Sequence, residues 1–424
     1  MVLNYMMVAV AIFLITYIAI VLDKINSTTV ALFGAGVMLV IGVINQKQAI
    51  ANIDFNTIGL LVGMMIIVNI LKRTGVFEFL AIKAAKLAKG DPWKIVVLFS
   101  LLTALASALL DNVTTVLLIV PVTLVITDTL EVNPIPFLVP EILIANIGGT
   151  ATLIGDPPNI MIGSAANLGF MDFIINLAPV IVVITAVTLF IFKFIYRNGY
   201  HASDDRKKIV LSMNEEIAIK NHKLLKKSLF VLILTMLGFI IHDKIGLESA
   251  TVALSGAALL LLLSGIDPED ILIEVEWSTI FFFMALFILV GALVEVGAID
   301  ILAKGMLSVT KGNPFVTAMV ILWVSAIASS FLNNIPFVAT MIPLIQSMEA
   351  VGHMNVTPLW WALALGACLG GNGTLIGASA NVIVGGMLDK HGNKLTFGSY
   401  FKVGFPLMLV SIVISSAYLW IFYL

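Results

Sequence analysis

The chain has 424 residues, of which 60% are hydrophobic and 11% are charged, and its mean hydropathy is +1.10. Because an average soluble domain carries about 25% charged residues, this composition excludes a soluble enzyme, a nucleic-acid-binding protein and a disordered protein. The formal net charge of −2 provides no basic field for DNA or RNA, and a single cysteine, Cys368, excludes an intramolecular disulfide framework. The composition therefore predicts an all-α, multi-pass membrane protein.

The first half of the chain supplies the apolar runs of roughly 20 residues that membrane-spanning helices need. Scaffold helices are expected within residues 1–91, and their last stretch has the pattern of an amphipathic helix at the membrane interface. The following segment is apolar with a polar centre, and the next is apolar but broken by glycines. In chain order, the predicted segments are 3–22, 28–45, 56–71, 77–89, 93–129, 136–168 and 172–196.

The second half repeats this order after a polar, charge-rich segment, 197–227, which is predicted to be a cytoplasmic linker. Scaffold helices are expected within residues 228–312. In chain order, the predicted segments of this half are 228–242, 249–265, 278–297, 301–308, 314–347, 358–388 and 403–424. Counting the broken spans but leaving out the polar-centred and interfacial segments gives ten spans in the whole sequence.

The basic residues lie unevenly along this arrangement. If the N-terminus is outside and ten spans follow, 19 of the 23 Lys and Arg fall on the inner side or at its edge. The outer side keeps only Lys47, Lys244, Lys304 and Lys311. Because cytoplasmic loops carry an excess of Lys and Arg, the sequence predicts a plasma-membrane protein with both termini outside.

The two halves match each other at one offset of 222 residues. The segment GGTATLIGDPPNIMIG (148–163) aligns with GGNGTLIGASANVIVG (370–385), and eight of the sixteen positions are identical. The same offset pairs Asn112 with Asn334 and Lys89-Gly90 with Lys311-Gly312. A self-match at a fixed offset indicates internal duplication, so residues 1–196 and 228–424 are predicted to be two structural repeats.

Each predicted repeat contains five spans, and because five is odd the second copy must be inverted relative to the first. This parity is the same whether the polar-centred segment is a re-entrant hairpin or two full crossings. Inverted repeats with interrupted helices are typical of secondary transporters, whose binding site lies near the bilayer midplane. Only five histidines occur, none of them in the breaks, and no nucleophile–base pair is visible, so an enzyme is not expected.

Polar residues occupy the centres of both predicted hairpins. Residues 93–129 turn at Asp111-Asn112, and residues 314–347 turn at Asn333-Asn334. The second arm of the first hairpin, 116–126, is short for a full crossing, which favours a re-entrant hairpin. An unpaired Asp or Asn in hydrocarbon costs several kcal/mol, so these tips are expected to face protein, water or a ligand. The alternative is that they only cap the second arm.

The glycine-rich breaks are predicted to unwind and to expose carbonyl groups that can coordinate a cation. A half-helix then restarts with Asp156 as its N-cap, and in the second copy Ser379 is a possible cap. Free N–H groups at these starts suit an anion or a polar solute; the alternative is a packing kink made of small residues. The candidate binding residues of tips and breaks are Asp111, Asn112, Thr114, Gly149, Thr150, Thr152, Asp156, Asn159, Asn333, Asn334, Gly371, Asn372, Thr374, Ser379 and Asn381.

The two copies differ in charge at these places. The first carries Asp111 and Asp156 where the second has Asn333 and Ala378, and no Lys or Arg lies in any tip or break. Desolvated carboxylates without a basic partner bind a cation or take up a proton. We therefore expect Na⁺ or H⁺ as the coupling ion, bound in the first repeat, and no other cofactor.

At these motifs the sequence resembles a known group of transporters. LDNVTTVLLIVPVT, IGGTATLIGDPPN, EWSTIFFFMALFILV, NNIPF-ATMIP and GACLGGNGTLIGASANV are similar to the family of the melanosomal P protein and its prokaryotic relatives. That family stands beside the ArsB arsenite permeases in the ion transporter superfamily. The resemblance covers nearly the whole chain. It implies inverted repeats, each with one re-entrant hairpin and one broken helix, a homodimer joined through its scaffold helices, and a transport domain that moves like an elevator.

Carried over by position, the resemblance implies one cation site at Asn112 and Thr114 with the 148–152 loop. Asn334 with the 370–374 loop is the implied counterpart, so Na⁺ is expected at Asn112, Asp156, Asn334 and Asn372. The tips depart from the Ser-Asn-Thr tips of dicarboxylate symporters, which argues against a dicarboxylate. The predicted function is ion-coupled transport of a small anion or oxyacid such as arsenite; a Na⁺/H⁺ antiporter and an anion channel are the alternatives.

Overall fold

Apolar runs closed by helix caps build the whole of the described chain. The computed structural model describes residues 2–22, 24–352 and 354–424, and within these ranges every regular element is a helix. The first half contains α1 (Val2–Leu22), α2 (Ser27–Ile41), α3 (Gln46–Ala51), α4 (Phe55–Lys72), α5 (Val76–Leu87), α6 (Pro92–Leu109), α7 (Asn112–Leu130), α8 (Ile135–Gly149), α9 (Pro157–Ala166) and α10 (Phe170–Ile195).

The connecting segment holds η1 (Arg197–Gly199), α11 (Asp204–Ser212) and η2 (Glu215–Ala218). The second half contains α12 (His222–Ile241), η3 (His242–Ile245), α13 (Ser249–Ser264), α14 (Pro268–Leu272), α15 (Trp277–Glu295), α16 (Ala298–Thr310), α17 (Pro314–Phe331), α18 (Asn334–Gly352), α19 (Thr357–Gly370), η4 (Gly371–Gly373), α20 (Ser379–Lys390) and α21 (Phe397–Phe422).

Ten of the described helices are long and apolar enough to cross a membrane, but they are not the ten expected spans. They include both arms of each hairpin, whereas α2, α8 and α13 have only 15 or 16 residues. The expectation that the second arm of the first hairpin is short is wrong, since α7 has 19 residues. The helix continues past its apolar part to Leu130, and there Thr127 and Thr129 donate to carbonyls one turn earlier.

The helices of the two halves follow the same spacing as the sequence match. Eight helices of the first half begin 222 residues before eight of the second, as Pro92 and Pro314 illustrate. The pairs are α2 and α13, α3 and α14, α4 and α15, α5 and α16, α6 and α17, α7 and α18, α8 and α19, and α9 and α20. The backbone agrees, because Lys89 and Lys311 both adopt positive φ, 55° and 54°.

The scaffold helices pack across the two halves in a reciprocal way. Helix α2 packs against α15, and α4 packs against α13, so each contact is the counterpart of the other under the same offset. Small residues allow the close approach: a Cβ added at Gly63 in α4 would lie 2.6 Å from the backbone of Ala253 in α13. The hairpins and broken helices form a second group, in which α6 packs on α8 and α17 on α19.

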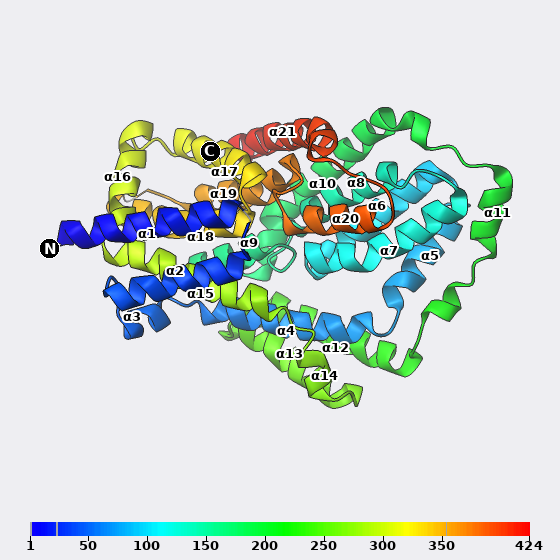
Figure 1. The fold of residues 1–424 in the computed structure, drawn as a ribbon, viewed down its shortest axis with the longest axis horizontal. Coiled ribbons are helices and arrows are strands. Elements are labelled where there is room, and N and C mark those ends of the chain that lie inside the picture. The colour runs from blue at the N-terminus through cyan, green and yellow to red at the C-terminus, as the bar shows by residue number, and fades with distance from the viewer. Residues whose placement is uncertain (1, 23, 353) are drawn as a thin grey trace.

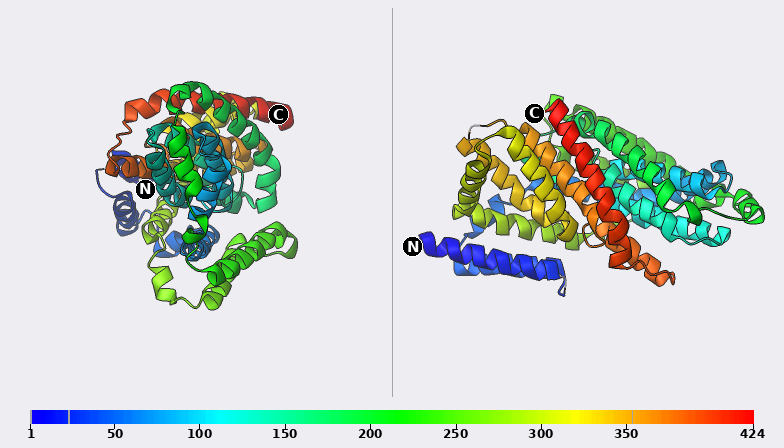
Figure 2. Two further views of the ribbon diagram at one scale, coloured as in Figure 1. Left: turned by 90° about the vertical axis from the view of Figure 1, so that its right-hand side faces the viewer. Right: turned by 90° about the horizontal axis from the view of Figure 1, so that it is seen from above.

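The two hairpins enter the molecule from opposite ends. In Figure 1, α6 and α7 extend from the right end, beside α11, while α17 and α18 extend from the left, and their tips lie near the middle. Figure 2 shows the same helices from two further directions, with α11 at one end of the longest axis and the start of α1 at the other. Opposed hairpins bring the two tips and the two helix breaks toward one region.

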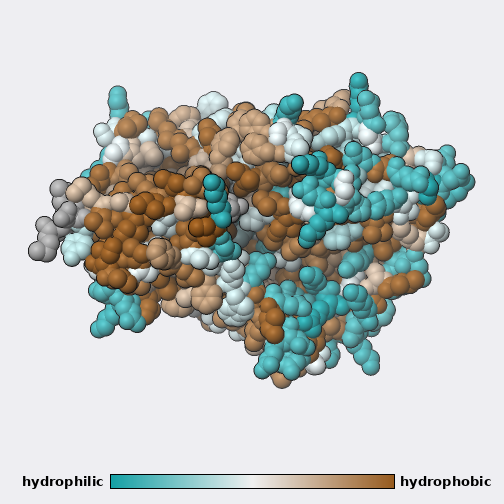
Figure 3. All heavy atoms as spheres, viewed as in Figure 1, coloured by the Kyte–Doolittle hydropathy of each residue, from teal (hydrophilic) through white to brown (hydrophobic). Residues whose placement is uncertain are grey.

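The surface divides into an apolar and a hydrophilic part. Figure 3 shows an apolar face over α1, α2 and α18, while hydrophilic residues gather at the end that carries α11. On α1, Leu14, Ile15 and Ile18 are all more than half exposed. Exposed aliphatic side chains on long helices suit contact with lipid, because lipid tails are as apolar as the side chains themselves.

The segment predicted as a linker packs against the first half: η2 contacts α5, and α11 contacts α7. Its end differs from the prediction, because α12 begins at His222, capped by Asn221, and carries Lys223 and Lys226 in its first turns. The N–H of Lys220 donates to the carbonyl of Thr74. A Cβ added at Gly75 would lie 1.8 Å from the carbonyl of Ala218. The final helix also starts earlier than expected, at residue 397.

Two ion pairs fasten this linker, and one of them predicts a pH effect. Arg206 pairs with Glu131, and Lys86 pairs with Glu215. The hydrogen bond from Lys86 holds the pKa of Glu215 below its ordinary value of 4.5. A lowered folded-state pKa stabilises the contact above the unfolded value and loses it as pH falls through the folded value. We expect the protection of the amides of residues 215–220 against hydrogen exchange, taken relative to intrinsic exchange at each pH, to fall only below about pH 4.5, and Lys86→Met to remove this pH step.

Candidate functional site

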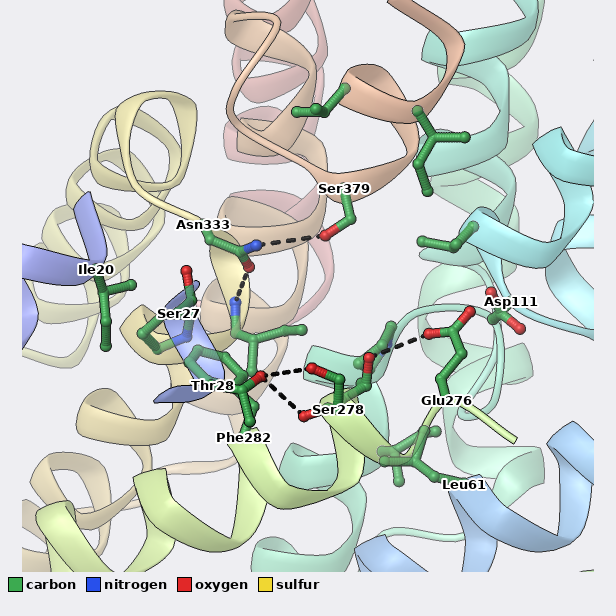
Figure 4. Close-up of a pocket in the computed structure, with 18 of the residues that line it drawn as sticks. Ile20, Ser27, Thr28, Leu61, Asp111, Glu276, Ser278, Phe282, Asn333 and Ser379 are labelled. Carbon is green, nitrogen blue, oxygen red and sulfur yellow. Dashed lines mark hydrogen bonds between the residues drawn. The ribbon is translucent and has the colours of Figure 1, made fainter. Parts of the chain in front are cut away.

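A cavity of about 880 Å³ lies between the scaffold helices and the hairpin tips. Scaffold residues such as Thr28 and Glu276 form one wall, and Asp111, Asn333 and Ser379 form the other. Figure 4 shows the carboxylate groups of Glu276 and Asp111 turned toward each other, and the amide of Asn333 reaching the hydroxyl of Ser379. Among the described residues that line the cavity, none is Lys, Arg or His. The cavity is therefore apolar with an acidic end.

The tip of the first hairpin is a capped helix start. Asp111 accepts hydrogen bonds from the N–H and the hydroxyl of Thr114, at 2.7 and 2.6 Å. The tip of the second hairpin is built in the same way, since Asn333 accepts from the N–H of Ile335 at 3.1 Å. Capping thus accounts for the polar residues at both tips, and Asp111 and Asn333 in addition face the cavity. The next residues, Asn112 and Asn334, are buried beneath them.

The first helix break holds a buried carboxylate with one oxygen that lacks a hydrogen-bond partner among the described residues. Asp156 stands at the N-cap of α9 as predicted, but its side chain makes no capping hydrogen bond. The reason is local: Pro157 and Pro158 have no N–H to donate, and the N–H of Asn159 donates to the backbone carbonyl of Asp156. Instead Asp156 Oδ1 accepts from Asn334 Nδ2 at 3.3 Å. Its Oδ2 is buried without a hydrogen-bond partner in the described part of the chain.

The second helix break differs from the prediction at its restart. Ala378, the counterpart of Asp156, is the N-cap of α20, and Ser379 is the first helical residue rather than the cap. The hydroxyl of Ser379 faces the cavity and accepts from Asn333 at 3.4 Å. The expectation of free N–H groups at both half-helix starts holds for α20 but is wrong for α9, where prolines occupy the first two positions.

Threonine and serine hydroxyls fasten each break to its own hairpin. Thr152 donates to the carbonyl of Ala108 at 2.5 Å, and its counterpart Thr374 donates to the carbonyl of Ser330. Near both breaks a hairpin serine also donates to the broken helix, at 2.6 Å in each copy: Ser107 to Ala145 and Ser329 to Ala367. These hydroxyls hold the backbone in place, so hairpin and broken helix form one unit in each half.

Two asparagines hold the unwound segments open. Asn159 donates to the carbonyls of Thr150 and Thr152 at 3.1 and 2.9 Å. Asn381 donates to those of Gly371 and Thr374 at 2.8 and 2.9 Å. These four carbonyl groups lie just beyond the ends of α8 and α19. Each carbonyl oxygen still has a second lone pair that can coordinate a cation. At Gly149, a candidate residue, an added Cβ would lie 2.4 Å from the carbonyl of Gly155.

One central residue was missed by the sequence reasoning. Asn146, in the last turns of α8, is fully buried and contacts Asn112 from the first tip as well as Asn372 and Asn381 from the second break. The sequence held one signal for it: the offset pairs Asn146 with Cys368, so the two copies differ in polarity at this position next to the break.

A second buried acid lies away from the cavity. Glu141 in α8 is 1% exposed and accepts from the hydroxyl of Thr123 at 2.8 Å. Its other oxygen has no hydrogen-bond partner in the described ranges. Glu141 is therefore a core residue of the first half, and its counterpart in the second half is Leu363.

The donor set around the breaks suits an alkali cation or a proton. Within the described residues no three side chains of His, Cys, Asp or Glu come together, so the oxygens available are amide, carbonyl and carboxylate groups. Asp156, Asn334 and Asn112 supply them at the first break, and Asn372 with the nearby carbonyls supplies them at the second. Hard cations prefer such oxygen ligands.

Two hairpin tips and two helix breaks that meet beside a cavity in a multi-pass helical bundle define a membrane transporter. The fold is similar to that in the crystal structure of the YdaH transporter of Alcanivorax borkumensis, with a TM-score of 0.58 and 13% identity, over 88% of this chain and 86% of that one. The chain belongs to the CitMHS family, described as citrate transporters, whose profile matches residues 17–366.

Curated relatives extend over the whole chain. An uncharacterized transporter of Mycobacterium tuberculosis is 44% identical over 422 residues, covering 98% of each chain. A 46 kDa membrane protein of Mycobacterium leprae is 41% identical over 425 residues, covering 98% of this chain and 99% of that protein. The human P protein is 34% identical over 496 residues, covering 97% of this chain but 59% of its own length. The resemblance to the P protein family is thus confirmed.

Proposed function

We propose that the chain is a Na⁺- or H⁺-coupled secondary active transporter that moves a small anion or oxyacid by alternating access with an elevator motion. The observation that carries this proposal is the free carboxylate of Asp156, which is buried at a helix break and held by Asn334 of the opposite hairpin. A buried carboxylate without a basic partner needs a cation or a proton. Asp156 therefore supports a coupling-ion site between the two halves.

The charge of the cavity restricts the solute. Asp111 and Glu276 lie on opposite walls, and the described lining contains no base, so a free polyanion meets repulsion there. The solute is therefore a neutral oxyacid, such as protonated arsenite, or an anion whose charge is balanced by a cation bound with it. Citrate, which the family description names, fits only in the second form.

A second candidate is a Na⁺/H⁺ antiporter in which the cation itself is the cargo. The same acidic pair, Asp111 and Glu276, favours this function because it attracts cations into the cavity. An anion channel, the third alternative, finds no support in this lining. A homodimer and a plasma-membrane location with both termini outside belong to the proposal as well.

Flux through proteoliposomes with imposed Na⁺ and pH gradients separates these functions. Arsenite, citrate with and without Mg²⁺, phosphate and dicarboxylates are offered one at a time. We expect gradient-driven accumulation of arsenite or of the Mg²⁺-balanced anion. Movement of Na⁺ against H⁺ without any solute would establish the antiporter instead. Anion conductance that persists without a cation gradient would overturn ion coupling.

A further inference from the structure

Four buried asparagines connect the tip of the first hairpin to the break of the second half. Asn112 Nδ2 donates to Asn146 Oδ1 at 3.0 Å. Asn146 Nδ2 donates in turn to Asn372 Oδ1 at 2.8 Å and to Asn381 Oδ1 at 2.9 Å. All four side chains are at most 3% exposed. Asn146 is the only one of the four outside the candidate binding residues, and it touches the other three.

The hydrogen bonds run in one direction and end on backbone carbonyls, two in the second break and one in α8. Asn381 donates to the carbonyls of Gly371 and Thr374, and Asn372 donates to the carbonyl of Leu143. Asn146, Asn372 and Asn381 thus each accept on the oxygen and donate from the nitrogen, and Asn112 donates into this chain. Because a buried amide without partners is costly, turning any one of these side chains disturbs the next, and the four amides are oriented as a unit.

The symmetry-related position has no comparable connection. Cys368 is the counterpart of Asn146, and its Sγ lies 3.5 Å from Asn159 Oδ1. This contact mirrors the one between Asn146 and Asn381. A thiol is a weak donor, so this mirrored contact carries little orientation. The strong connection between the halves therefore passes through Asn146.

We propose that Asn146 is a positioning residue that couples the two cation sites, so that occupation of one site raises the affinity of the other. A cation that fixes Asn112 at the first site also fixes Asn146 and, through it, the amide of Asn381 that holds the carbonyls of the second site. The second cation then meets a site that is already ordered, which produces positive cooperativity without a large movement. This inference rests on the proposed function, because it needs two coupling ions.

None of the four amides is among the described residues that line the cavity. A role in holding the solute is therefore separate from the role proposed here, and the two can be measured apart. Replacing Asn146 by Cys makes the first half equal to the second at this position and leaves Asn112, Asn372 and Asn381 without their shared partner. We expect cation binding to change although no ligand atom has been removed.

The test measures thermal unfolding of the purified full-length protein in detergent against NaCl, with choline chloride as the balancing salt, at a series of pH values. The wild type is expected to be stabilised by Na⁺ along a sigmoidal curve, because the second site offers only amide and carbonyl oxygens, which bind Na⁺ but no proton. In Asn146→Cys we expect the half-saturating concentration to rise by at least about fivefold and the curve to become hyperbolic, since site–site coupling is typically worth about 5- to 150-fold. Asn52→Cys, which removes an amide that donates to the carbonyl of Gln48 beside α3, is the matched control and is expected to stay within about twofold of the wild type.

The outcomes separate the inference from the proposed function. A folded Asn146→Cys protein with the sigmoidal curve and half-saturation of the wild type overturns the coupling role, and so does an Asn52→Cys protein changed to the same degree. A wild type that responds to H⁺ alone overturns the inference but not the proposed ion coupling, and one that responds to neither Na⁺ nor H⁺ overturns both. If Asn146→Cys does not fold, Asn146→Ser is measured in the same way, because its short hydroxyl cannot reach all three partners.

Discussion

Asp156→Asn is expected to abolish ion-gradient-driven uptake into proteoliposomes. The substitution keeps the size of the side chain, and its amide still has an oxygen for Asn334, but it removes the only charge at the first helix break. Mutating a residue that only hydrogen-bonds to a metal ligand lowers metal affinity by about 10- to 100-fold. Loss of the charged ligand itself is therefore expected to lower the affinity for the coupling ion by at least about 100-fold.

Two variants make this result specific to the free carboxylate. Asp205→Asn removes a linker carboxylate whose side chain is 90% exposed, and it is expected to transport like the wild type. Pro158→Ala returns an N–H at the second helical position, where a capping carboxylate bonds, and it is expected to weaken coupling in the same direction by a smaller factor. Undiminished gradient-driven uptake by Asp156→Asn would show that the coupling ion binds elsewhere.

The sequence predicted the elements that local patterns determine. Helices α6 and α17 begin at Pro92 and Pro314 and are capped by Asp91 and Asn313, so proline and a capping side chain marked their starts. The hairpin tips and helix breaks were equally visible, because Asp111 and the glycine pairs interrupt apolar runs. Each of these signals acts within a few residues along the chain, which is why composition and spacing were enough.

The parts that the sequence did not reveal depend on contacts between distant segments. Asn146 lies in an uninterrupted helix, and its partners Asn372 and Asn381 are 226 and 235 residues away. Glu276 reads only as the residue before a helix, yet it forms an acidic wall of the cavity opposite Asp111. The start of α12 was placed too late because its first turns carry lysines, although a helix can extend beyond the apolar part of a span.

The helix breaks close so tightly that a single methyl group is expected to disrupt them. A Cβ added at Gly155 would lie 2.5 Å from the carbonyl of Gly149 and 2.6 Å from that of Ser107. Both neighbours are backbone, so neither can turn aside as a side chain would. We expect Gly155→Ala to lower the free energy of unfolding by about 1–3 kcal/mol and to remove transport, because α6, α8 and the start of α9 must move apart.

The second break supplies a graded comparison for this prediction. At Gly377, the counterpart of Gly155, an added Cβ would lie 2.7 Å from the carbonyl of Gly371 and 3.0 Å from those of two serines. Gly377→Ala is therefore also expected to lower the free energy of unfolding, but by less than Gly155→Ala does. Gly36→Ala in α2 is the control, since no atom lies within 4 Å of its added Cβ, and the better helix propensity of alanine should raise stability by up to about 1 kcal/mol. Thermal unfolding in detergent measures all three, and equal effects of Gly36→Ala and Gly155→Ala would show that backbone crowding does not shape the break.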